Sequence, residues 1–139
     1  MGLTEFLAQN KRSTKVIDYV VSDEILGEDG KPAVWKLKAI PAKEDRALRD
    51  SCTKIIKNKN GQPMSQSFNQ NEYFSRLVAK CVVEPDLNNV ELQNAYGVMS
   101  DFELLEALLE AGEFARLLNK VQDINNYSPM NEKVEEAKN

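Results

Sequence analysis

The sequence predicts an α+β fold, with antiparallel β-hairpins near the N-terminus packed on a mainly α-helical bundle and a helical C-terminal half. Short runs of β-branched and aromatic residues flank an Asp29-Gly30 dipeptide, which is typical of a hairpin turn. Later stretches repeat apolar residues at helical spacing. A chain of 139 residues with 42% hydrophobic and 29% charged side chains has the size and composition of one globular domain.

The first 40 residues are predicted to contain a short leading segment and one hairpin. Residues 15–21 are rich in β-branched side chains, and residues 33–40 alternate as a strand with one packed face does. That face carries Trp35, the single tryptophan, which we expect to anchor the core. Ahead of the hairpin, residues 3–9 are predicted to form one short helix, followed by a polar and basic linker.

A helix is expected at residues 42–52, because a proline ends the preceding strand and suits the first turn of a helix. Asp45 and Arg49 lie four positions apart in it and are predicted to form a surface ion pair. The next residues, 53–68, fit either an extension of this helix followed by a loop, or a second hairpin. The Asn60-Gly61 dipeptide between two short runs favours the hairpin.

A further helix is predicted at residues 71–83, with Asn69 as an N-cap signal and Pro85 as its stop. Its apolar side chains repeat at helical spacing and are expected to face the core. They are Phe74, Leu77, Val78 and Cys81. A cysteine on such a face is expected to be a buried thiol.

Residues 88–127 carry the clearest helical pattern of the chain. A short helix is expected at 89–95, with Asn88 as its N-cap and Tyr96-Gly97 as its end. A second helix is expected at 101–110, opened by a capping box in which Ser100 and Glu103 each satisfy a backbone N–H of the other.

Ala111-Gly112 is predicted to stop this second helix, since glycine tolerates the left-handed conformation of a C-cap. The last helix then starts near Glu113 and ends at Asn125-Asn126. Its apolar residues follow the spacing of a half-buried helix, and they are Phe114, Leu117, Leu118, Val121 and Ile124. In outline, residues 1–14 are expected to be a flexible segment, 15–127 one domain and 128–139 a disordered tail.

Charge is divided unevenly along the chain. From Cys81 to Ala115 there are eight Asp or Glu residues and no Lys or Arg, whereas residues 11–59 have a net charge of +4. Two interpretations remain open: the two charged faces attract each other within the domain, or they support head-to-tail self-association or a partner. The net charge of −4 argues against binding nucleic acid.

The sequence offers little for catalysis. It has no histidine, no glycine-rich phosphate loop, and only two cysteines, Cys52 and Cys81, without further ligands at metal spacing. We therefore expect no enzyme activity, no metal and no cofactor. No apolar window is long enough to span a bilayer, and the N-terminus lacks the apolar core of a signal peptide, so the expected location is the cytoplasm.

The order of these elements resembles the XkdN-like tail assembly chaperones of contractile-tailed phages and phage-like particles. The most specific part is the run PDLNNVELQNAYGVM, followed by a leucine-rich helix and GEFARLLNKVQDIN. The resemblance covers roughly residues 15–127. It implies a viral protein, made in the bacterial host and largely absent from the finished particle, that binds the tape measure protein and keeps it soluble until the tail tube polymerises. Related chaperones also occur as a longer frameshifted form that recruits tail tube protein.

The acidic, leucine-rich helices are the predicted partner-binding surface, and some of the apolar residues there must belong to the core. The candidate residues are Phe102, Glu103, Leu105, Glu106, Leu109, Glu110 and Phe114. A homo-oligomer is compatible with the divided charge. Two other functions remain open, a small structural tail or connector component of the virion and a regulatory module that docks a helix.

Overall fold

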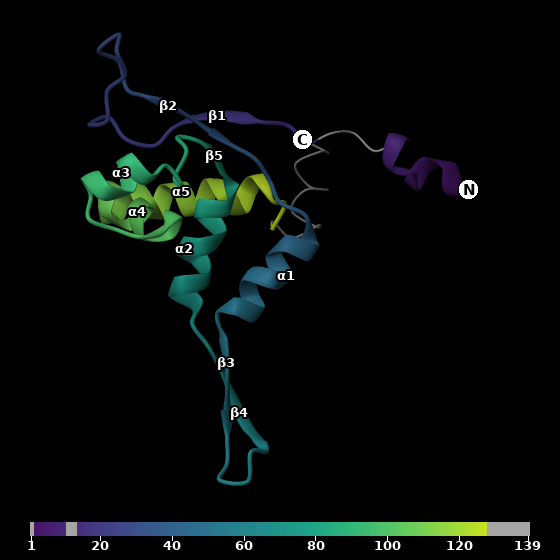
Figure 1. Ribbon diagram of the computed structural model, residues 1–139. Coiled ribbons are helices and arrows are strands. Elements are labelled where there is room, and N and C mark those ends of the chain that lie inside the picture. Colours follow the sequence, from purple (N-terminus) through teal and green to yellow (C-terminus); the bar gives the residue numbers. More distant parts are fainter. Residues whose placement is uncertain (1, 11–13, 128–139) are drawn as a thin grey trace.

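The computed structural model describes residues 2–10 and 14–127, and these residues adopt an α+β fold, as predicted (Figure 1). A three-stranded antiparallel sheet has the order β1-β2-β5, and β3 and β4 form a separate hairpin. The strands are β1 (Ile17–Val20), β2 (Val34–Leu37), β3 (Thr53–Lys57), β4 (Pro63–Phe68) and β5 (Val82–Glu84). The α-helices are α1 (Ala42–Ser51), α2 (Gln70–Cys81), α3 (Val90–Ala95), α4 (Asp101–Leu108) and α5 (Ala111–Ile124).

The first hairpin is confirmed, with Ile17 opposite Leu37 and Val20 opposite Val34. Trp35 is only 2% exposed, so it anchors the core as expected. The third strand, β5, was not predicted; it pairs with β2 through Leu37 and Val82. Its three residues follow α2 directly, so their short apolar run looks like the end of that helix in the sequence. For this reason the predicted helix 71–83 extends too far.

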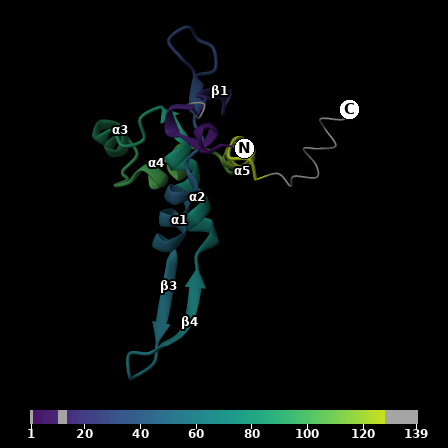
Figure 2. The ribbon, with the colours of Figure 1, turned by 90° about the vertical axis from the view of Figure 1, so that its right-hand side faces the viewer.

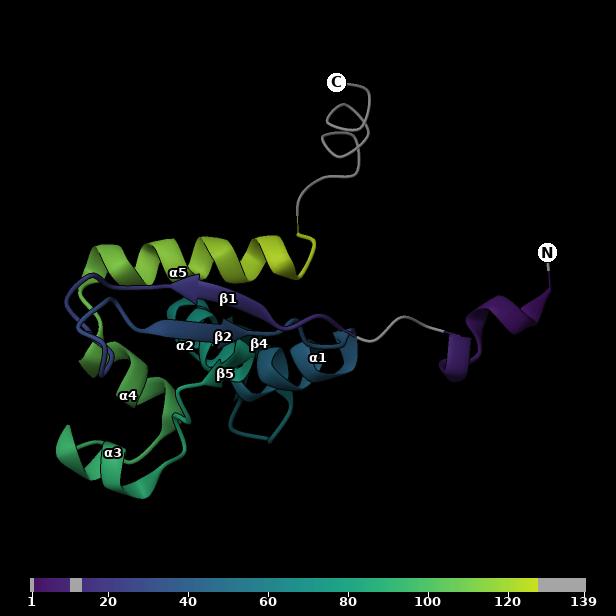
Figure 3. The ribbon, with the colours of Figure 1, turned by 90° about the horizontal axis from the view of Figure 1, so that it is seen from above.

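Helix α2 lies at the centre of the structure and contacts α1, α4 and α5 (Figures 1 and 3). It begins at a cap where the Asn69 side chain accepts a hydrogen bond from the Glu72 N–H (3.1 Å). Its buried residues are Tyr73, Ser75, Leu77, Val78, Ala79 and Cys81. Opposite them, Leu104, Leu105, Leu117 and Val121 of α4 and α5 are fully buried. The hydrophobic core is therefore built around α2.

The short helix α3 begins one residue later than predicted, because Asn89 and not Asn88 accepts from the Leu92 N–H (2.9 Å). It ends at Tyr96, and Gly97 takes a left-handed conformation with φ +67°, as the sequence indicated. At the start of α4, Ser100 accepts from the Glu103 N–H. The Glu103 carboxylate accepts from the Ser100 hydroxyl (2.9 Å) and not from its N–H, so only half of the predicted capping box forms.

The predicted stop at Ala111-Gly112 is wrong: α4 ends at Leu108, and α5 already begins at Ala111. The Glu113 carboxylate accepts a hydrogen bond from the Glu110 N–H (2.8 Å) and so caps the first turn of α5. The helix therefore starts at Ala111, two residues before the predicted start near Glu113. Gly112 consequently lies in the first turn of α5. The end of α5 at Ile124, with Asn125 as C-cap, agrees with the prediction.

The β3–β4 hairpin resolves the ambiguity at residues 53–68, and it projects from the body as an isolated two-stranded ribbon (Figures 1 and 2). Gly61 in its turn has φ +80°, which an Asn-Gly hairpin requires. At the N-terminus, two 3-10 turns, Leu3–Phe6 and Ala8–Asn10, replace the single helix expected there. Most of the linker and the predicted tail 128–139 lie outside the described residues.

Candidate functional site

The seven predicted partner-binding residues are divided between the core and the surface. Leu105 is fully buried and Leu109 is 9% exposed, so both belong mainly to the core. Phe102 and Phe114 are half-buried. The three glutamates, Glu103, Glu106 and Glu110, are exposed. The aromatic and acidic candidates are thus the ones that remain accessible.

A groove of about 490 Å³ lies where α2, α4 and α5 meet, and it includes three of the predicted residues. Its lining residues are Asn71, Phe74, Ser75, Glu106, Leu109, Ala111, Phe114, Ala115 and Leu118. Most of this lining is apolar. The small side chains Ala111 and Ala115 leave room for a bulky group between Phe114 and α2.

A hydrogen bond fixes one wall of this groove. The Ser75 hydroxyl donates to the Glu106 carboxylate at 2.6 Å, which ties α4 to α2. Ser75 is 4% exposed, so its hydroxyl requires this partner. Glu106 therefore has a structural role in addition to the surface role predicted for it.

Phe102 lies beside the groove but does not line it. The Arg76 guanidinium lies 4.4 Å from the centre of its ring, and the same guanidinium forms an ion pair with Glu72 at 2.8 Å. These contacts cover part of the Phe102 ring. Phe102 is consequently a weaker candidate for partner contact than Phe114.

The charge around the groove is acidic. Glu106 lies in its wall, Glu103 is exposed one turn earlier on α4, and Glu110 is exposed at the N-cap of α5. The described lining residues include no Lys or Arg. An apolar groove with an acidic rim favours an amphipathic helix whose polar side is basic.

The contribution of α2 to the groove was not predicted from the sequence. Asn71, Phe74 and Ser75 come from α2, where periodicity assigned Phe74 to the core and gave no role to its neighbours. Periodicity identifies which side chains share a helix face but cannot show which face meets another helix. Only the packing of α2 against α4 and α5 places these residues beside Phe114.

A carboxylate cluster lies at the start of α5, where oxygens of Glu24, Glu110 and Glu113 all lie within 4.8 Å of one another. The pKa of Glu113 is lowered below its ordinary value, mainly by a hydrogen bond from Ser22. The pKa of Glu24 is raised above its ordinary value, mainly by a hydrogen bond with Glu110. These contacts attach the loop after β1 to the cap of α5, and we assign no metal to the cluster.

In the part of the chain that the structure describes, none of the helices combines the length and apolar character needed to cross a bilayer.

Comparison with known proteins gives consistent matches over nearly the whole chain. The sequence model of the phage XkdN-like tail assembly chaperone family matches residues 3–138. In Bacillus subtilis (strain 168), the phage-like element PBSX protein XkdN is 24% identical over 139 residues, which is 99% of this chain and 93% of XkdN. The uncharacterized protein YqbN of the same strain is 24% identical over 136 residues, 97% of this chain and 91% of YqbN.

A solved structure also has the same fold. The crystal structure of the protein YqbN superposes with a TM-score of 0.76 at 20% identity, covering 92% of this chain and 98% of that one. The family match extends beyond residues 15–127, where the resemblance was found, into both terminal segments.

Proposed function

This chain belongs to the XkdN-like family of phage tail assembly chaperones, and from this premise we propose that it binds the tape measure protein and keeps it soluble until the tail tube polymerises. The tape measure protein is a very long helical chain. Its apolar stripes would self-associate if they were left exposed. A chaperone for such a chain needs a surface that covers one short stretch of helix at a time.

The groove between α2, α4 and α5 is the observation that supports this function best. It offers about 490 Å³ between Phe74, Phe114 and Leu118, all half-buried. Helix-in-groove recognition uses apolar anchors spaced three or four residues apart on the bound helix. A cavity of this size accepts one or two such anchors, so each chaperone copy would cover a short segment.

The acidic rim would set the orientation and the release of the bound helix. Glu103 and Glu110 are exposed beside the groove and can pair with Lys or Arg flanking the apolar stripe. Exposed pairs contribute only about 0–1 kcal/mol each, so they guide binding without making it permanent. Many moderate contacts along one chain hold it collectively, and tail tube subunits can displace them one at a time.

We place this activity in the cytoplasm of the bacterial host, during assembly of a contractile tail, with the chaperone absent from the mature particle. A longer form that recruits tail tube protein would act at the same stage.

Filling the groove tests this function. Ala115 is exposed and lines the groove, so Ala115→Arg places a long side chain in it without removing a core contact. The variant should lower affinity for the tape measure protein at least about tenfold, because the anchor positions that dominate binding become blocked. Binding can be measured by biolayer interferometry with a helical fragment of that protein.

Asn119→Arg is the matched control. Asn119 lies one turn further along α5, is exposed and does not line the groove, so this change adds the same charge to the same helix. Its affinity should stay within about twofold of the wild type. Equal affinities for the two variants, both folded by circular dichroism, would exclude the groove as the binding site.

A further inference from the structure

A second pocket adjoins the groove between α2, α4 and α5. Its volume is about 210 Å³, less than half that of the groove, so it accepts one side chain and not a stretch of helix. Phe74 lines both the groove and this pocket, so the two share a wall. The apolar contacts proposed for the groove leave this pocket without a role.

The groove and the pocket are in line along α5. Ala111, Ala115 and Leu118 of the groove and Gln122 of the pocket are spaced by four, three and four residues. Residues at this spacing lie on one face of an α-helix. A partner helix that lies along this face of α5 would therefore contact both the groove and the pocket.

The pocket is polar where the groove is apolar. Most of its lining consists of side chains with N–H or O–H groups, and these are Arg49, Gln70, Tyr73, Gln122 and Tyr127. Arg49 is the one charged residue among the described lining residues of the pocket, whereas Glu106 is the one charged residue among those of the groove. The two parts of this surface thus differ in the sign of their charge.

The Arg49 guanidinium is held in a fixed position at the pocket. Its Nε donates to the Asp45 carboxylate at 2.9 Å, and its central carbon lies 4.4 Å from the centre of the Tyr73 ring. A guanidinium has five N–H groups, so a bond through Nε leaves donors for a ligand. The Arg49 side chain is 47% exposed, and Asp45 is not among the described residues that line the pocket. A carboxylate that enters the pocket can therefore bind to Arg49.

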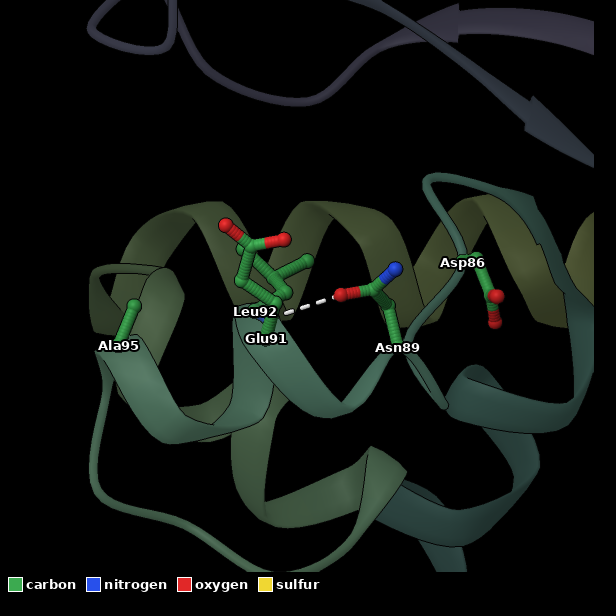
Figure 4. Close-up of a pocket in the computed structure, with 5 residues that line it drawn as sticks. All are labelled: Asp86, Asn89, Glu91, Leu92 and Ala95. Atoms are coloured by element: carbon green, nitrogen blue, oxygen red, sulfur yellow. Dashed lines mark hydrogen bonds between the residues drawn. The ribbon is translucent and has the colours of Figure 1, made fainter.

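A hollow on α3 has the opposite character. It measures about 430 Å³ and is lined by Asp86, Asn89, Glu91, Leu92 and Ala95 (Figure 4). Its two charged residues are carboxylates, and the side-chain oxygen of Asn89 already accepts from the Leu92 N–H (2.9 Å; Figure 4). Because like charges repel, this hollow does not compete with the polar pocket for an acidic side chain.

The spacing along α5 predicts the spacing on the bound helix. Gln122 follows Ala115 by seven residues and Phe114 by eight. An α-helix rises 1.5 Å per residue, so the pocket lies about 10–12 Å beyond the centre of the groove. A partner helix that lies along α5 has the same rise. Its residue at the pocket is therefore seven or eight positions away from its apolar residue in the groove.

We propose that the polar pocket binds a glutamate of the tape measure helix, seven or eight residues from the apolar side chain that the groove holds. This inference rests on the proposed function, since it names the sequence pattern that the groove and the pocket recognise together. The acidic rim attracts a basic residue, and Arg49 attracts the acidic one. A reversed helix would place like charges together at both positions, so the bound helix has one direction.

A glutamate scan of a bound fragment tests this pattern. Overlapping helical fragments of the tape measure protein of the same tail operon are first screened for binding to the full chain by biolayer interferometry. In the fragment that binds most tightly, each glutamate is then replaced by lysine, one at a time. One replacement, seven or eight residues from an essential apolar residue, should lower affinity at least about tenfold, and the others should change it by less than about threefold.

Gln122→Glu tests the pocket from the side of the chaperone. Gln122 is half-buried, and the change keeps its shape, leaves Arg49 and Asp45 in the chain and adds a carboxylate where the glutamate would bind. Affinity for the unaltered fragment should fall at least about tenfold, because two carboxylates then share one pocket. The fragment with lysine at the critical position should bind this variant more tightly than it binds the wild type.

Asn119→Asp is the matched control. It makes the same amide-to-carboxylate change at an exposed residue of α5 that lines neither the groove nor the pocket, and affinity should stay within about twofold of the wild type. A fragment that loses affinity with Ala115→Arg but binds Gln122→Glu as tightly as the wild type would overturn this inference and leave the groove in place. A scan in which no glutamate lowers affinity would do the same. If no fragment binds, the proposed function fails, and this inference fails with it.

Discussion

The hydroxyl of Tyr73 connects three parts of the fold, and its removal should measurably destabilise the protein. Tyr73 is 2% exposed, and its hydroxyl donates to the Asp45 carboxylate of α1 and lies 3.3 Å from the hydroxyl of Tyr127 beyond α5. The Arg49 guanidinium lies 2.9 Å from the same carboxylate and 4.4 Å from the Tyr73 ring centre. The predicted Asp45–Arg49 ion pair is thus part of a larger network.

Tyr73→Phe keeps the ring and removes only the hydroxyl. The Asp45 side chain is 18% exposed, so it would lose a donor where water only partly replaces it. A hydrogen bond to a charged group contributes about 1.5–3 kcal/mol. Because Asp45 keeps Arg49 and some water, we expect the free energy of unfolding at pH 7 to fall by about 1–2 kcal/mol.

The loss should depend on pH. Burial alone would raise the pKa of Asp45, but hydrogen bonds from Tyr73 and Arg49 outweigh burial and lower that pKa below its ordinary value. A carboxylate with a lowered folded-state pKa adds stability above its unfolded-state pKa, near 3.9, and loses it as the pH falls through the folded-state value. The difference between wild type and Tyr73→Phe should therefore shrink below about pH 4.

Urea unfolding followed by Trp35 fluorescence measures this effect, since Trp35 is the single tryptophan and is buried. Tyr96→Phe is the control: Tyr96 is 45% exposed and lies outside this network, so removing its hydroxyl should change stability by less than about 0.5 kcal/mol. Equal stability of wild type and Tyr73→Phe at pH 7, or a difference that persists unchanged at pH 3, would refute this account of the network.

Two further predictions concern the core. Leu105→Ala should lower the free energy of unfolding by about 2–5 kcal/mol, because Leu105 is a fully buried residue of α4, which packs against α2, and its truncation leaves a cavity. A loss below about 1 kcal/mol in urea unfolding would mean that Leu105 is a surface contact after all. Cys52 is 3% exposed and Cys81 is fully buried, and burial is the main cause that raises the pKa of the Cys81 thiol. Both thiols should react with Ellman's reagent at least about a hundredfold more slowly than in the denatured chain; rapid reaction of one thiol per native chain would contradict this burial.

Local signals in the sequence predicted much of the fold. The Asp29-Gly30 and Asn60-Gly61 turns, the Asn69 cap and the apolar pattern of α5 all act over a few residues, and all are present in the structure. One error arises where two local signals compete. Glu113 caps α5 from within its own first turn and moves the helix start to Ala111, although Gly112 suggested a stop there.

The candidate site was predictable only in part, because it is built from three helices. Glu106, Leu109 and Phe114 were expected and do line the groove. Phe74 lies opposite them on α2, and no spacing within one helix could reveal that. The central position of α2 is likewise a result of packing and not of its own sequence pattern.

Co-expression with the tape measure protein of the same tail operon, followed by size exclusion with light scattering, tests the chaperone function most directly. The account predicts a complex with many copies of this chain on each tape measure chain, and a tape measure protein that aggregates when this chain is left out. A tape measure protein that remains soluble alone and forms no complex would contradict it.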